Sequence, residues 1–108
     1  MGLDIYLVCP CCECVIYTDN ITHNLNKMAM ELGVYKHLWR PDEISITTAK
    51  QLIEPLENAR KLFENDWDKY KEFEPANGWG TRKGLLRFIN GYLLACQKSH
   101  GARIEISR

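Results

Sequence analysis

The clearest pattern in this chain lies in residues 85–96, which read LLRFINGYLLAC. Apolar side chains recur there at intervals of three and four residues, at Leu85, Phe88, Ile89, Tyr92, Leu93 and Cys96. Because an α-helix completes a turn in about 3.6 residues, this spacing places them on one face. We predict a long amphipathic helix that Thr81 caps and that ends at His100 and Gly101.

Three short segments predict a sheet on which that helix face can pack. Residues 102–107 and residues 3–8 alternate between apolar and polar side chains, as half-buried strands do. Residues 15–18 are β-branched or aromatic, so we expect a β-hairpin in which residues 9–14 form the loop. A lone hairpin is marginally stable in water. We therefore predict an α+β fold, in which the N-terminal hairpin and the C-terminal strand form a three-stranded sheet with about three helices on one face.

The middle of the chain predicts further helices. Residues 23–35 have helical spacing and follow two candidate caps, Thr22 and Asn24. Thr48 and Gln51 match a capping box in front of the apolar stripe Leu52, Leu56, Ala59 and Phe63. Pro55 either kinks this helix or begins a new one. Residues 66–73 predict one or two further helical turns, and residues 36–45 and 75–80 predict loops.

Composition indicates one soluble domain spanning residues 1–108. The chain has 108 residues, of which 45% are apolar and 26% are charged. Fourteen basic residues balance fourteen acidic ones, which excludes a general cationic coat for nucleic acid. No apolar run approaches the roughly 20 residues of a membrane span, and the acidic N-terminal segment does not resemble a signal peptide. We expect a cytoplasmic protein without a membrane partner.

Charge is nevertheless unevenly distributed along the chain. Residues 75–108 contain six basic residues against Glu105 alone, whereas residues 41–74 contain nine acidic residues and five basic ones. This contrast predicts a local basic surface in the last third of the chain, facing something negative.

Four of the five cysteines, Cys9, Cys11, Cys12 and Cys14, fall within six positions. Such crowding and an odd total argue against a disulfide-stapled fold and favour a reducing compartment. Thiolates at C-x-x-C spacing are zinc ligands, and two or three of them with His23, or a metal shared between two chains, would complete a site. The alternative is a solvent-facing loop that is rich in thiols. Cys96 belongs to the core.

The segment that begins the long helix has the composition of an anion site. Glycines allow close backbone approach, and free N–H groups at a helix start attract negative charge. We name Trp79, Gly80, Arg82 and Lys83 as candidate ligand-binding residues. The alternative is a turn in which the glycines take positive φ and Trp79 covers the core.

Two polar segments are further candidates for ligand binding. Asn20, Thr22, His23 and Asn24 lie where a strand passes into a helix, and their alternative role is capping and turn formation. Trp39 and Arg40 combine a stacking surface with a bidentate donor, although such a tryptophan also anchors loops to a core.

Several of these segments carry a resemblance to known proteins. The residues are THN at 22–24, LWRPD at 38–42, NGWG at 77–80 and the terminal SR at 107–108. In them the chain resembles a set of small proteins of phages and bacteria that has no assigned activity. The resemblance implies no catalytic residue, but it directs attention to these segments and implies a phage-encoded protein.

Together these features predict a binding protein rather than an enzyme. Helix starts, amides, arginines and indole rings are suited to holding an anionic, nucleotide-like ligand, and a phage protein could instead inhibit a host factor. The alternatives are a protein–protein interaction module and a zinc-binding regulator that uses the cysteine hairpin. An exposed sheet edge also predicts a homo-oligomer.

Overall fold

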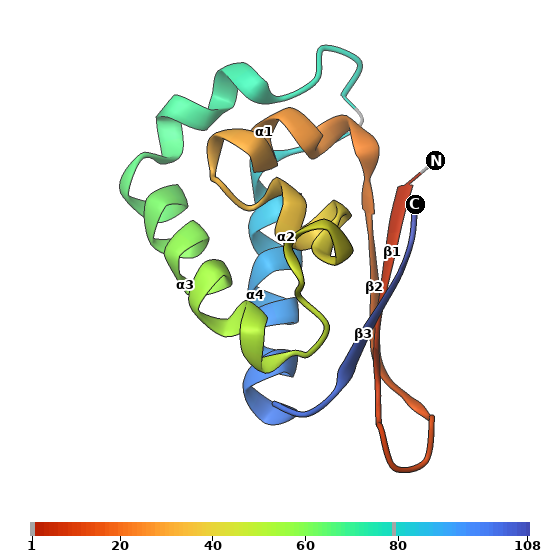
Figure 1. Ribbon diagram of the computed structural model, residues 1–108. Helices are drawn as coiled ribbons and strands as arrows, with labels where there is room; N and C mark the ends of the chain where they lie inside the picture. Colours follow the sequence, from red (N-terminus) through yellow and green to blue (C-terminus); the bar gives the residue numbers. More distant parts are fainter. Residues whose placement is uncertain (1, 79) are drawn as a thin grey trace.

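The computed structural model describes residues 2–78 and 80–108 of the chain and has the predicted α+β fold. Strands β1 (Gly2–Val8), β2 (Val15–Thr22) and β3 (Arg103–Ser107) form an antiparallel sheet with the order β2-β1-β3. The helices lie on one side of this sheet (Figure 1).

The central strand β1 determines which sheet face meets the helices. Leu3, Ile5 and Leu7 are fully buried, as the alternating pattern predicted. Leu3 pairs with Ile21 of β2, and Ile5 pairs with Ile106 of β3. Since paired residues project to the same side of a sheet, all three strands contribute apolar side chains to this one face.

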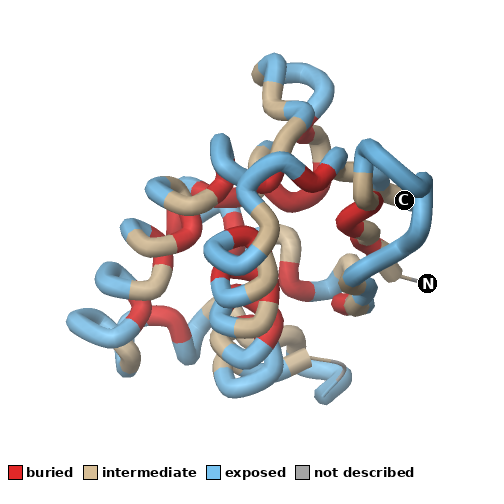
Figure 2. Tube along the Cα trace, turned by 90° about the horizontal axis from the view of Figure 1, so that it is seen from below, coloured by how far each residue is buried: buried red, intermediate tan, exposed pale blue. Residues whose placement is uncertain are grey.

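Two long helices provide most of the opposite layer. Helix α3 (Lys50–Asn65) packs along α4 (Arg82–Lys98), and α4 also packs on β2. The six residues that defined the helical pattern of α4 are all buried, and the Thr81 hydroxyl accepts the predicted capping hydrogen bond from the Gly84 N–H. Figure 2 shows the buried stretches on the sides of these helices that face each other and the sheet.

The helix expected over residues 23–35 is broken into shorter pieces. The 3-10 turn η1 (His23–Leu25) precedes α1 (Asn26–Glu31), and a separate helix α2 (Tyr35–Trp39) occupies part of the expected loop. Gly33 has φ of +74°, which ends α1. Because the chain changes direction at this break, the side chains of Leu38 and Trp39 are buried in the core. A straight continuation of α1 would place these two side chains differently.

The region between α2 and α4 follows the expected order of elements. A 3-10 turn, η2 (Pro41–Ile44), leads to α3, and η3 (Trp67–Phe73) follows α3 where one or two turns were predicted. Helix α3 continues through Pro55, so no new helix begins there. Gln51 accepts the backbone N–H of Thr48 at 3.1 Å, as in a capping box, and the helix N-cap is Ala49.

None of the helices in residues 2–78 and 80–108 is long and apolar enough to cross a membrane.

Candidate functional site

Segments that are distant in the sequence meet at the end of the molecule where β2 passes into η1 (Figure 1). The Trp39 indole N–H donates a hydrogen bond of 2.8 Å to Nδ1 of His23. The Arg108 guanidinium donates to the Trp39 carbonyl at 2.9 Å and to Asp42 at 3.2 Å. The fold therefore joins the THN, LWRPD and terminal SR segments through direct contacts.

Gly80, the last residue of the NGWG segment, lies at the same place. A Cβ built on Gly80 would lie 2.9 Å from Cγ of Leu25 and 3.1 Å from a methyl carbon of Thr22. Its φ of +139° is also one that L-amino acids rarely adopt. Only glycine permits this close approach, which brings the loop before α4 against η1.

Within this group, Trp39 and Thr22 have structural roles. Trp39 is 3% exposed and stacks on Tyr35 with ring centroids 5.5 Å apart. The Thr22 hydroxyl accepts the Asn24 N–H at 3.3 Å, as its capping role predicted. Arg40 contacts Glu43, and Asn20 donates to Asp4 on the sheet face opposite the helices, so neither is directed toward His23.

A cleft with a volume of about 620 Å³ lies beside η1 and α1. We call it the His23 cleft, and its lining residues are His23, Asn24, Asn26, Lys27, Glu72, Phe73, Glu74 and Pro75. Because Nδ1 of His23 accepts the Trp39 hydrogen bond, the imidazole proton is on Nε2 and that nitrogen is a donor. The cleft therefore combines an oriented imidazole, two amides, one ammonium group, two carboxylates and one aromatic ring.

The start of α4 binds a carboxylate of the chain itself. The Arg82 backbone N–H donates to Oε2 of Glu74 at 2.9 Å, and the Arg82 side chain lies 3.6 Å from the same oxygen. The Arg82 side chain is 16% exposed, and its guanidinium lies over the Trp67 ring at 4.8 Å and donates to the Trp67 carbonyl. The Arg82 N–H at this helix start thus donates to a carboxylate of the chain itself, whereas the sequence predicted an anionic ligand there. Lys83 is exposed beside it, and Trp79 lies outside the described residues.

The last two arginines of the chain, Arg103 and Arg108, also form ion pairs with acidic residues. Arg103 contacts Glu13 at 2.9 Å and Glu105 at 2.8 Å, and Arg108 contacts Asp42. Arg103 and Arg108 both line a groove along β3, where their charges are thus already paired. Arg82, Arg103 and Arg108 of the basic last third are therefore in ion pairs with acidic residues from earlier in the chain.

The cysteine segment forms the loop of the hairpin, as predicted. Cys9, Cys11, Cys12 and Cys14 are free thiols at the surface, whereas Cys96 is fully buried and burial raises its pKa to about 12. The backbone N–H groups of Cys12 and Cys11, together with the Cys12 thiol, donate to the Cys9 sulfur and lower the pKa of Cys9. Among the described residues, no three His, Cys, Asp or Glu side chains are grouped so that they could hold a metal ion.

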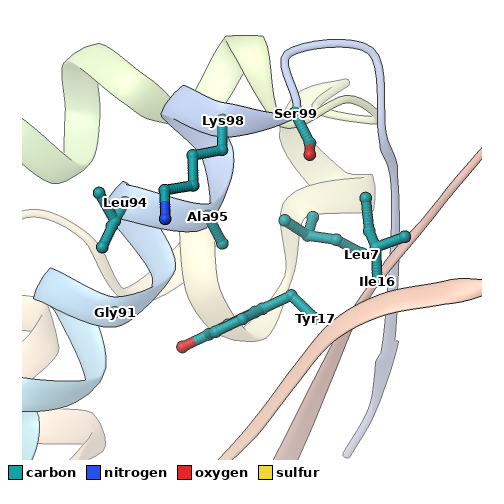
Figure 3. Close-up of a pocket in the computed structure, with 8 residues that line it drawn as sticks. All are labelled: Leu7, Ile16, Tyr17, Gly91, Leu94, Ala95, Lys98 and Ser99. Carbon is teal, nitrogen blue, oxygen red and sulfur yellow. The ribbon is translucent and has the colours of Figure 1, made fainter.

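A second, mainly apolar pocket of about 330 Å³ lies between β2 and α4 (Figure 3). Leu7, Ile16, Leu94 and Ala95 contribute apolar walls, and the Tyr17 ring extends from β2 toward Gly91. Burial raises the pKa of the Tyr17 phenol to about 12, and the charge of Asp19, to which the phenol donates a 3.3 Å hydrogen bond, raises it further. The charged side chain of Lys98 also lines this pocket.

Several residues of the His23 cleft carry no clear signal in the sequence. Asn26 and Lys27 looked like ordinary residues of the first helix, and residues 72–75 looked like a connection to a loop. The available signal was the placement of Phe73 between two glutamates and directly before a proline-containing loop. That signal is weak, because nothing local shows that this segment folds back against His23.

Comparisons of the chain with protein-family models, with curated proteins and with solved structures found no match. The resemblance to small phage and bacterial proteins stays a prediction.

Proposed function

We propose that this protein is a non-enzymatic binding protein that holds an anionic, nucleotide-like ligand in the His23 cleft. The observation that carries the proposal is the combination of fixed donors and a flat apolar surface in one cleft. His23 is oriented by the buried Trp39, and the amides of Asn24 and Asn26 lie in the same cleft as the Phe73 ring.

Each of these groups matches one part of a nucleotide. Side-chain amides form paired hydrogen bonds with base edges, and aromatic rings provide a stacking surface for any base. Glu72 supplies an acceptor for ribose hydroxyls, as acidic residues do in nucleotide-binding folds. The Lys27 ammonium group supplies a positive charge for a phosphate.

Charge and size are compatible with this assignment. The Glu74 carboxylate is close to Arg82 and to the start of α4, which offset its negative charge. The volume of about 620 Å³ lies within the range of small-molecule sites. We thus propose the ligand class that the sequence predicted, an anionic and nucleotide-like molecule. We assign the contact with its phosphate to Lys27 instead of Arg82.

The test is thermal unfolding with a panel of AMP, GMP, a cyclic dinucleotide and ribose 5-phosphate. A ligand that binds only the folded state stabilises it by about 2.7 kcal/mol at one hundred times its Kd. We expect a base-containing ligand to raise the Tm and ribose 5-phosphate to have a much smaller effect.

Two variants test whether the effect arises in the His23 cleft. Asn26→Ala removes one amide from the cleft and is expected to abolish most of the Tm shift, whereas Asn90→Ala, an exposed asparagine on α4, is expected to retain it. Equal shifts in both variants, or no shift with any nucleotide, would overturn the proposal.

A further inference from the structure

The hairpin loop has a defined conformation that holds two cysteines at C-x-x-C spacing. The Cys9 N–H donates to the Cys14 carbonyl at 2.9 Å, and the Glu13 N–H donates to the Cys9 carbonyl at 2.9 Å. Glu13 takes the left-handed conformation, with φ of +60°, and its side chain is held by Arg103. The turn is thus closed by two backbone hydrogen bonds and attached to β3 by an ion pair.

This turn contains both cysteines of one C-x-x-C pair, Cys9 and Cys12. Because the Glu13 N–H donates to the Cys9 carbonyl at 2.9 Å, the chain reverses within four residues, and both side chains start from the same tight turn. Cys14 lies outside this turn, and its thiol donates to the Cys12 carbonyl at 3.7 Å. Thiolates at C-x-x-C spacing are ligands that zinc accepts in proteins.

One chain cannot complete a structural zinc site with this pair. Such sites take four ligands in a tetrahedron. Within residues 2–78 and 80–108, no group of three or more candidate ligands is arranged around one position, so a single copy contributes a pair at most. The remaining two ligands must come from another molecule.

The position of the loop favours a second copy of this chain as that molecule. The hairpin extends past the helices, so its tip is open to approach (Figure 1). Val15 and Ile16, which directly follow Cys14, expose 55% and 47% of their surface. A second hairpin at the tip would shield this apolar surface from water and bring the same pair of thiols.

We propose that two copies of this protein bind one Zn²⁺ between their hairpin tips, with Cys9 and Cys12 of each copy as the four ligands. This site lies at the opposite end of the hairpin from the His23 cleft, so it is independent of the proposed nucleotide site. It makes the protein a zinc-dependent homodimer.

The experiment measures mass and metal content together. Protein treated with a chelator and kept reduced is titrated with zinc sulfate and followed by native mass spectrometry and light scattering after size exclusion. We expect a monomer without metal, and a dimer that contains one zinc ion per two chains after titration. Replacing zinc with Co²⁺ is expected to give the absorption spectrum of a tetrahedral thiolate complex.

Two double variants identify the ligands. Cys9→Ser with Cys12→Ser is expected to abolish zinc-induced dimerisation while leaving circular dichroism and the nucleotide-induced Tm shift unchanged. Cys11→Ser with Cys14→Ser serves as the matched control and is expected to dimerise with zinc as the original chain does. One zinc ion bound by a monomer, no zinc binding, or dependence on Cys11 and Cys14 in place of Cys9 and Cys12 would overturn the proposal.

Discussion

At the scale of single residues, Gly80 combines two constraints that no other side chain satisfies. Its φ of +139° strains any residue with a Cβ, and that Cβ would lie within 3.0 Å of two carbons of the buried Leu25. We predict that Gly80→Ala destabilises the fold by roughly 1–3 kcal/mol, through backbone strain and overpacking. Chemical denaturation measures the loss.

The matched control for this substitution is Gly101→Ala. An added Cβ at Gly101 meets nothing within 4 Å, and its φ does not lie in the unfavourable positive range. We expect a change within about 0.5 kcal/mol for the control. If the two variants had equal stability, the contact between Gly80 and Leu25 would not constrain the fold.

Tyr17 provides a prediction about pH. Burial and the Asp19 charge hold the phenol pKa at about 12, above the value near 10 of an unfolded chain. A group whose pKa is raised by folding contributes its full stability below the unfolded pKa, and the contribution is lost as pH rises through the folded value. We therefore expect stability to decline between about pH 10 and pH 12.

Phenolate absorbance in an alkaline titration checks this assignment, with Tyr17→Phe identifying the signal of Tyr17. Asp19→Asn removes one source of the shift and is expected to lower the Tyr17 pKa, so that the phenol ionises earlier in the titration. A Tyr17 titration that is unchanged by Asp19→Asn would show that burial alone causes the shift.

At the scale of secondary-structure elements, α3 contains an unfavourable residue. Pro55 lies inside a continuous helix, where it has no N–H to donate to the Gln51 carbonyl and its ring crowds that turn. We predict that Pro55→Ala stabilises the protein by about 1–3 kcal/mol, because interior proline is the least favourable residue in helices. Thermal and denaturant unfolding measure the gain.

A second helical substitution separates this effect from helix propensity in general. Asn58 is exposed one turn further along α3, and Asn58→Ala is expected to gain only about 0.5 kcal/mol. If Pro55→Ala gained no more than Asn58→Ala, or if it destabilised the chain, α3 would already accommodate the proline without cost.

The capping box before α3 shows which hydrogen bonds a local sequence pattern predicts and which it does not. The sequence predicted reciprocal bonds between Thr48 and Gln51, and the Gln51 half is confirmed, since its side chain accepts the N–H groups of Thr47 and Thr48. The Thr48 hydroxyl instead donates to Gln51. The pairing of Thr48 with Arg103 of β3 adds a constraint that no local rule includes.

At the scale of the whole molecule, stability depends on β3, which is the last of the three strands in the sequence. It pairs with β1 from Asp4 to Val8, and Ile104 and Ile106 pack on the core. Removing residues 103–108 would leave a two-stranded hairpin, which is marginal in water. We predict that a chain ending at Ala102 loses cooperative thermal unfolding and the near-ultraviolet circular dichroism of its packed aromatic rings.

The control for this truncation removes Arg108 alone, which leaves β3 and its pairing with β1 intact. That chain is expected to unfold cooperatively with a modest decrease in stability. A cooperative transition in the longer truncation would show that the helices and hairpin form a stable unit without β3.

The sequence by itself determined the elements whose signals are local. The period of 3.6 in α4 and the alternation in β1 and β3 identified the fold class and most of the buried face, because side chains that repeat with a structural period must share one surface. It also predicted the hairpin loop at the cysteines and the Thr22 and Thr81 caps.

Only the tertiary structure decided which contacts those segments make with one another. Residues far apart in the chain are joined by the contact between His23 and Trp39, by the position of residues 72–75 beside η1, and by the ion pairs of Arg103 with Glu13 and of Arg108 with Asp42. Such contacts depend on how the layers pack, and no local period or cap carries that information. At the start of α4, for example, the sequence predicted a site for an anionic ligand, and in the fold the Arg82 N–H donates to the Glu74 carboxylate of the chain itself.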